Sequence, residues 1–102
     1  MATEDILIGV VIDEVTLTLD ELAHACDVET QWIVERIENE ILKHPGDLQP
    51  DWRFKSIELM RVRRLVTVER DFDAHPEIAA LVVDLMEELD LKNAQLRAAG
   101  LS

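Results

Sequence analysis

The spacing of hydrophobic residues changes along the chain, and each spacing predicts a different kind of element. Between Ile6 and Leu19, hydrophobic residues alternate with other residues, which is typical of one or two short β-strands. From Leu19 onward they recur at intervals of three and four, which is typical of helices that bury one face. The pattern therefore predicts a short extended start followed by helices.

The first two predicted helices are short and lie on either side of a tight turn. Thr18-Leu19-Asp20-Glu21 matches a capping box, so the first helix is expected to start there and to end near Asp27. A turn over residues 27–30 leads into a second helix over about residues 30–41. Such a pair is typical of a helix-turn-helix. The expected buried faces are Leu19, Leu22, Ala23 and Cys26 in the first helix and Ile33, Val34, Ile37 and Ile41 in the second.

Turn residues at positions 44–47 precede the segment Trp52-Arg53-Phe54, whose alternating aromatic residues predict a short strand. Paired with the N-terminal strand, it would form a small β wing, with Trp52 and Phe54 in the core. A third helix is expected from Lys55 or Ser56 to Arg70. Its inward positions are Leu59, Val62, Leu65 and Val66.

The last predicted helix spans about residues 76–98, between Pro76 at its first position and Gly100 just past its end. Its hydrophobic residues repeat in alternating steps of four and three, like the seam of a coiled coil. Packing on its own domain would cover the hydrophobic residues in the first half of this helix, whereas those in the second half need another partner. The seam comprises Ile78, Val82, Leu85, Leu89, Lys92 and Leu96.

Taken together, the elements predict a mostly α fold with a small β wing. Residues 1–74 are expected to form a winged helix-turn-helix-like domain. Residues 75–102 form a C-terminal helix that packs on it and extends into a coiled coil, so that the whole chain is a single domain.

Charge narrows the range of partners. The chain has 102 residues with 22 acidic and 10 basic side chains, which gives a net charge of −12. Residues 1–51 carry −11, residues 52–74 carry +2 and residues 75–102 carry −3. Nucleic acid is a disfavoured partner because binding it requires Lys and Arg to displace counterions. A basic protein surface would be attracted instead.

The sequence offers little for catalysis or for cofactor binding. Nearly all of its carboxylates fall on the solvated faces of the predicted helices, its histidines match no zinc spacing, and its three glycines are not clustered. We therefore expect no enzyme activity, no cofactor and no metal. Cys26 is the only cysteine, and the longest hydrophobic run, Ile6 to Ile12, is too short for a membrane helix. A cytoplasmic protein without a membrane span is expected.

Two other features allow two interpretations each. Arg61, Arg63 and Arg64 either contact nucleic acid or an acidic peptide, or pair with the surplus carboxylates of neighbouring helices. Trp32 stands beside Ile33 on the second helix, so one of the two is expected to be partly exposed. An exposed tryptophan there would mark an interface.

The order of these motifs resembles the chaperone-modulator family, the CbpM-like relatives of the MerR-type regulators. The resemblance covers about residues 15–101. The residues that carry it are Leu17-Thr18-Leu19-Asp20-Glu21-Leu22, Cys26-Asp27-Val28, Trp52-Arg53-Phe54, Leu85-Met86-Glu87-Glu88-Leu89, Leu91-Lys92 and Gln95-Leu96-Arg97.

The resemblance implies a non-enzymatic protein that binds the J-domain of a DnaJ-like, CbpA-type co-chaperone and blocks its work with Hsp70. J-domains present a basic helix to Hsp70, so an acidic chain could occlude that helix. The candidate contacts form exposed acidic rows: Glu35 and Glu38 on the second helix, and Asp84, Glu87 and Glu88 on the last.

Two alternatives stay open. One is a MerR-like transcriptional regulator that uses the helix of Arg61, Arg63 and Arg64 and a coiled-coil dimer. The second predicted helix departs from the DNA-binding pattern of such regulators, because Arg36 is its single arginine. The other alternative is a structural subunit that forms a homodimer through its C-terminal helix.

Overall fold

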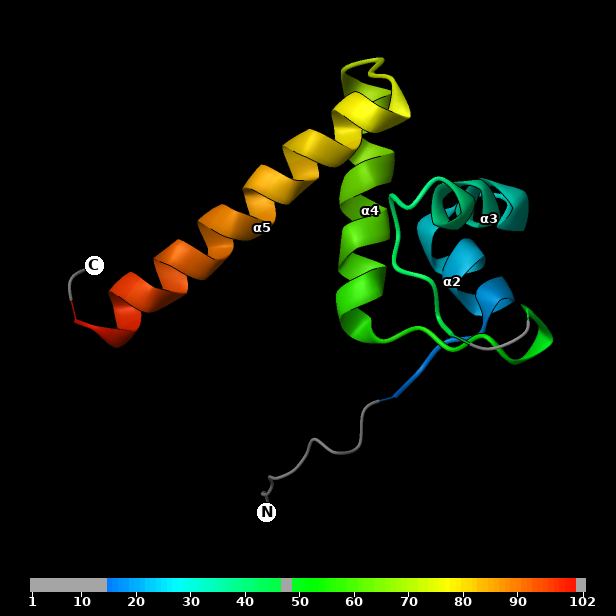
Figure 1. Ribbon diagram of the computed structural model, residues 1–102, viewed down its shortest axis with the longest axis horizontal. Coiled ribbons are helices and arrows are strands. Elements are labelled where there is room, and N and C mark those ends of the chain that lie inside the picture. Colours follow the sequence, from blue (N-terminus) through cyan, green and yellow to red (C-terminus); the bar gives the residue numbers. More distant parts are fainter. Residues whose placement is uncertain (1–14, 47–48, 101–102) are drawn as a thin grey trace. The chain divides into compact units, whose positions relative to one another are not determined.

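The computed structural model describes residues 15–46 and 49–100, and its elements within these ranges are helical (Figure 1). The chain divides into two compact units between Val62 and Arg63, inside helix α4 (Ser56–Asp71). The first unit contains α2, α3, η1 and the start of α4, and the second contains the rest of α4 and α5. The mostly helical fold is confirmed, and the domain boundary expected at residue 74 stays a prediction.

Helix α2 (Leu19–Cys26) starts at the predicted capping box. The Glu21 N–H donates to the Thr18 hydroxyl over 3.1 Å, and the Thr18 N–H donates to the Glu21 carboxylate over 2.8 Å. Asp27 ends the helix in a left-handed conformation, and the Val28 N–H donates to the Ala23 carbonyl over 3.0 Å. Leu22, Ala23 and Cys26 are buried as expected.

Helix α3 (Thr30–Glu38) packs against α2 and ends earlier than the expected residue 41 (Figure 1). Glu40 adopts a left-handed conformation with φ 63°. The N–H groups of Ile41 and Leu42 both donate to the Arg36 carbonyl, over 2.8 and 3.1 Å. These bonds provide hydrogen-bond donors for the Arg36 carbonyl in the last turn of the helix. The side chains of Ile41 and Leu42 are buried in the loop that follows.

The small β wing is not confirmed, because the described residues contain no strand. Leu17 and Phe54 instead form a single antiparallel bridge with two hydrogen bonds of 2.8 Å. The bridge is short because the chain turns toward a helix on each side, at the Thr18 cap and at Lys55. Of the one or two strands expected between Ile6 and Leu19, residues 6–14 lie outside the described residues. Trp52 follows an unexpected 3₁₀ turn, η1 (Gln49–Asp51), and is buried together with Phe54 as expected.

The two long helices match the predictions closely. Helix α4 begins at Ser56, and α5 (Pro76–Ala98) has Pro76 in its first turn, with Gly100 following its end at φ 74°. On α4, Val62, Leu65 and Val66 are buried, and Leu59 is half-buried.

Helix α5 buries a face different from the predicted seam. Ala79 and Val83 are fully buried, whereas the hydrophobic seam residues are exposed. Their exposed fractions are Ile78 54%, Val82 37%, Leu85 64%, Leu89 60% and Leu96 45%. The coiled-coil spacing therefore marks a surface that α5 presents to solvent.

Candidate protein-interaction surface

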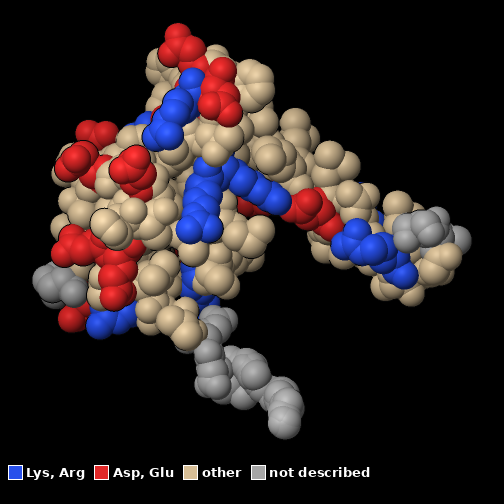
Figure 2. All heavy atoms as spheres, turned by 180° about the vertical axis from the view of Figure 1, so that it is seen from behind, with Lys and Arg blue, Asp and Glu red and all other residues tan. Residues whose placement is uncertain are grey.

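The helix-turn-helix segment, residues 19–40, presents acidic side chains to solvent. Seven of its residues are acidic and all seven are exposed, whereas its single Lys or Arg, Arg36, is buried. Figure 2 shows acidic side chains gathered over the part of the molecule that contains α2 and α3. The exposed acids are Asp20, Glu21, Asp27, Glu29, Glu35, Glu38 and Glu40.

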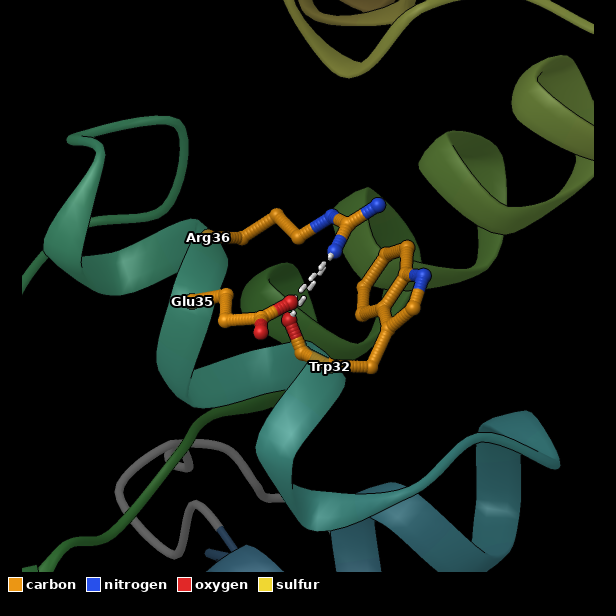
Figure 3. A network of polar contacts seen from close by, with 3 residues as sticks. All are labelled: Trp32, Glu35 and Arg36. Atoms are coloured by element: carbon orange, nitrogen blue, oxygen red, sulfur yellow. Dashed lines mark hydrogen bonds and ion pairs between the residues drawn. The ribbon is translucent and has the colours of Figure 1, made fainter.

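Arg36 lies against the side chain of Trp32, one turn earlier on α3 (Figure 3). Its guanidinium carbon is 3.9 Å from the centroid of the indole ring. Its Nη1 atom donates to the Trp32 carbonyl and pairs with the Glu35 carboxylate, each over 3.5 Å. A cation–π contact of this kind contributes about 0.5–2 kcal/mol. The basic side chain of α3 is thus engaged within its own helix.

Sequence reasoning counted Arg36 as the single arginine of this helix and did not predict its burial. A usable signal was the i, i+4 spacing of Trp32 and Arg36, which places two side chains together on one helix face. The prediction that Trp32 or Ile33 would be partly exposed is confirmed: Trp32 is half-buried and Ile33 fully buried.

The predicted contact residues lie in two separate rows. Glu35 and Glu38 are exposed and one turn apart on α3, in the first compact unit. Asp84, Glu87 and Glu88 are exposed on α5, in the second unit. Each row concentrates negative charge on one helix, and the role of both rows in binding stays a prediction.

The arginine cluster on α4 is largely engaged in internal contacts. The Nε and Nη2 atoms of Arg61 both donate to the Ile41 carbonyl, over 3.1 and 2.9 Å. Arg64 pairs with Asp90 over 2.6 Å, which confirms for this residue the expected pairing with a carboxylate. Arg63 is exposed. Two of the three arginines therefore make polar contacts within the chain.

Helix α5 carries an exposed hydrophobic surface, which we call the α5 apolar row. Successive helix residues are about 100° apart, so its members fall on one face, and Leu91 lies outside that face. The apolar row comprises Ile78, Leu81, Val82, Leu85, Leu89 and Leu96.

Other kinds of site find no support in the part of the chain that the structure describes. No cluster of three or more His, Cys, Asp or Glu side chains there could hold a metal ion. None of the helices in residues 15–46 and 49–100 is both long and apolar enough to span a bilayer.

Comparisons with known proteins show similarity to a family of regulators and to a chaperone modulatory protein. Residues 17–98 match the model of a family described as MerR HTH family regulatory protein. A chaperone modulatory protein CbpM of Pseudomonas entomophila (strain L48) is 27% identical over 75 residues, which cover 74% of each chain. No solved structure matches this chain.

Proposed function

We propose that this chain, which belongs to the MerR HTH family of regulatory proteins, acts as a non-enzymatic chaperone modulator in the cytoplasm. It binds the J-domain of a DnaJ-like, CbpA-type co-chaperone and inhibits the cooperation of that co-chaperone with Hsp70 (DnaK). The similarity to CbpM supports this function. The family match alone fits a DNA-binding regulator equally well.

The observation that carries the proposal is the charge of the helix-turn-helix surface. A helix that enters the major groove needs exposed donors beside a dense line of phosphates. Helix α3 instead exposes Glu35 and Glu38, and its one arginine is buried against Trp32. Such a surface repels a duplex and attracts a cationic helix.

The mechanism we propose is occlusion. An acidic surface that covers the basic helix of a J-domain keeps that helix from Hsp70 without any chemical step. Exposed charges contribute mainly to the association rate, and salt weakens their effect. The rows of Glu35 and Glu38, and of Asp84, Glu87 and Glu88, are the candidate contacts.

A binding titration tests this function against the regulator alternative. We expect a purified CbpA-type J-domain to bind the chain at low salt and to bind less tightly as salt rises. A generic DNA duplex is expected to bind weakly under the same conditions. Tight duplex binding, with no binding of the J-domain, would favour the transcriptional regulator.

The two acidic rows can be separated by charge reversal. Glu35→Lys with Glu38→Lys, and Asp84→Lys with Glu88→Lys, change the net charge by the same amount at different places. The pair that lies at the interface should slow association more than the other. Equal association rates for both double variants and the wild type would exclude both rows as contacts.

We further propose that the α5 apolar row joins two copies of this chain. The same row occurs in every copy, so a coiled-coil pairing of two α5 helices would cover it. Leu85→Glu should shift the molecule toward the monomer in light scattering across concentration. Leu91→Glu is the matched control, because Leu91 is 58% exposed and lies outside the α5 apolar row. A wild-type chain that is monomeric at all concentrations would contradict the homodimer.

A further inference from the structure

We propose that Trp32 is the hydrophobic anchor of the docking surface, and that its neighbours Glu35 and Glu38 select a cationic amphipathic helix as the ligand. We call these three residues the α3 docking face. The inference rests on the proposed function and deepens it by naming the side chain expected to contribute most to J-domain affinity.

The geometry of α3 places the indole beside the acidic row. At about 100° per residue, Glu35 lies about 60° around the helix from Trp32, and Glu38 follows on the same side. The buried residues Ile33 and Ile37 lie on the other side of Trp32. Trp32 therefore stands at the border between the core and the exposed acids, and it is half-buried.

The contact with Arg36 makes the indole a rigid anchor. The guanidinium carbon lies 3.9 Å from the centroid of the indole ring. The guanidinium is itself held by the Trp32 carbonyl and the Glu35 carboxylate. A side chain that is already fixed loses little rotamer entropy when a partner binds. Tryptophan is also enriched among the few residues that dominate binding energy at protein interfaces.

The chemistry of the face selects the ligand. Lys and Arg side chains lay their apolar stems on hydrophobic surface and extend their charged heads toward carboxylates. The exposed part of Trp32 can accept such a stem, and Glu35 and Glu38 can accept the heads. A helix with basic residues one turn apart fits this arrangement, whereas a phosphate backbone does not.

Binding of a tryptophan-free CbpA-type J-domain to variants of the full chain tests the anchor. Trp32→Ala is expected to raise the dissociation constant about tenfold or more. Met60→Ala is the control, because Met60 is an exposed hydrophobic residue of the same compact unit, and it should change affinity less than about twofold. If the wild type does not bind the J-domain, the proposed function fails. If the wild type binds and Trp32→Ala binds equally well, only the anchor is refuted.

The variant Arg36→Gln distinguishes the effect of the Trp32–Arg36 contact on affinity from the effect of the net charge of the surface. If the net charge of the surface alone determined affinity, removing a positive charge should tighten binding to a cationic helix. Loss of the Arg36 contact that holds the indole should instead weaken binding. We expect weaker binding, and tighter binding would overturn the role of the Trp32–Arg36 pair.

A measurement on the unmodified chain covers the case in which either substitution disturbs folding. The two tryptophans are Trp32, half-buried, and Trp52, only 6% exposed, so acrylamide should quench mainly Trp32. Saturation with the tryptophan-free J-domain should protect Trp32 from quenching. Unchanged quenching in a complex that has demonstrably formed would refute the anchor.

Discussion

Replacing Arg61 with lysine tests whether the arginine cluster on α4 serves the fold. Arg61 joins α4 to the loop after α3 through two N–H donors on the Ile41 carbonyl, at 3.1 and 2.9 Å. Lysine keeps the charge but cannot reproduce the planar pair of donors. The variant therefore changes the hydrogen bonds and leaves the long-range field as it was.

The expected loss follows from the kind of bond. Hydrogen bonds that involve a charged group contribute about 1.5–3 kcal/mol, and lysine can retain part of this at a half-buried site. We expect Arg61→Lys to lower the free energy of unfolding by about 1–2 kcal/mol. For a chain of this size, each kcal/mol corresponds to a decrease in Tm of about 4–8 °C.

Urea unfolding followed by tryptophan fluorescence measures this loss directly, because both tryptophans lie in the same compact unit as Arg61. Arg63→Lys is the matched control, since Arg63 is exposed on the same helix, and it should change stability by less than about 0.5 kcal/mol. Equal stability of the two variants would refute a structural role for Arg61.

Two further predictions concern helix ends. Thr18→Ala removes the hydroxyl that accepts from the Glu21 N–H and should destabilise the chain by about 1 kcal/mol in the same urea assay; an unchanged midpoint would show that the capping box contributes nothing. Glu40→Gly should stabilise the chain by about 0.5–1 kcal/mol, because glycine adopts the left-handed conformation at φ 63° without the Cβ penalty; a lower thermal midpoint would contradict this.

Helix positions could be predicted from the sequence because their signals are local. The capping box at Thr18, Pro76 at the first turn of α5 and Gly100 past its end each act on neighbouring backbone groups. The end of α3 could not be predicted in this way. Ile41 keeps the helical spacing of the core, but its N–H bonds to the Arg36 carbonyl after the left-handed residue Glu40.

The negative charge of the candidate site could be predicted from the sequence, but the side-chain contacts around it could not. The excess of acids around α3 follows from the sequence, and so does a partly exposed residue at position 32 or 33. The burial of Arg36 depends on which way a long side chain folds, and composition does not determine that. The bonds between Arg61 and Ile41 join residues that are distant in sequence, so no local pattern indicates them.

The exposed face of α5 shows how one periodicity can fit two environments. Heptad-like spacing indicates a hydrophobic stripe but not what covers it. In the structure, Ala79 and Val83 are buried instead, and the α5 apolar row is exposed to solvent. Buried Ala79 and Val83 on one face and the exposed α5 apolar row on another are consistent with a second contact of this helix.

The most direct test of the chaperone-modulator function is the ATPase rate of Hsp70 stimulated by a CbpA-type J-domain, measured as this chain is titrated in. Occlusion of the J-domain predicts that the rate falls to its unstimulated level once the chain reaches the concentration of the J-domain, and that high salt restores stimulation. A stimulated rate that stays constant at saturating chain, at low salt, would contradict it.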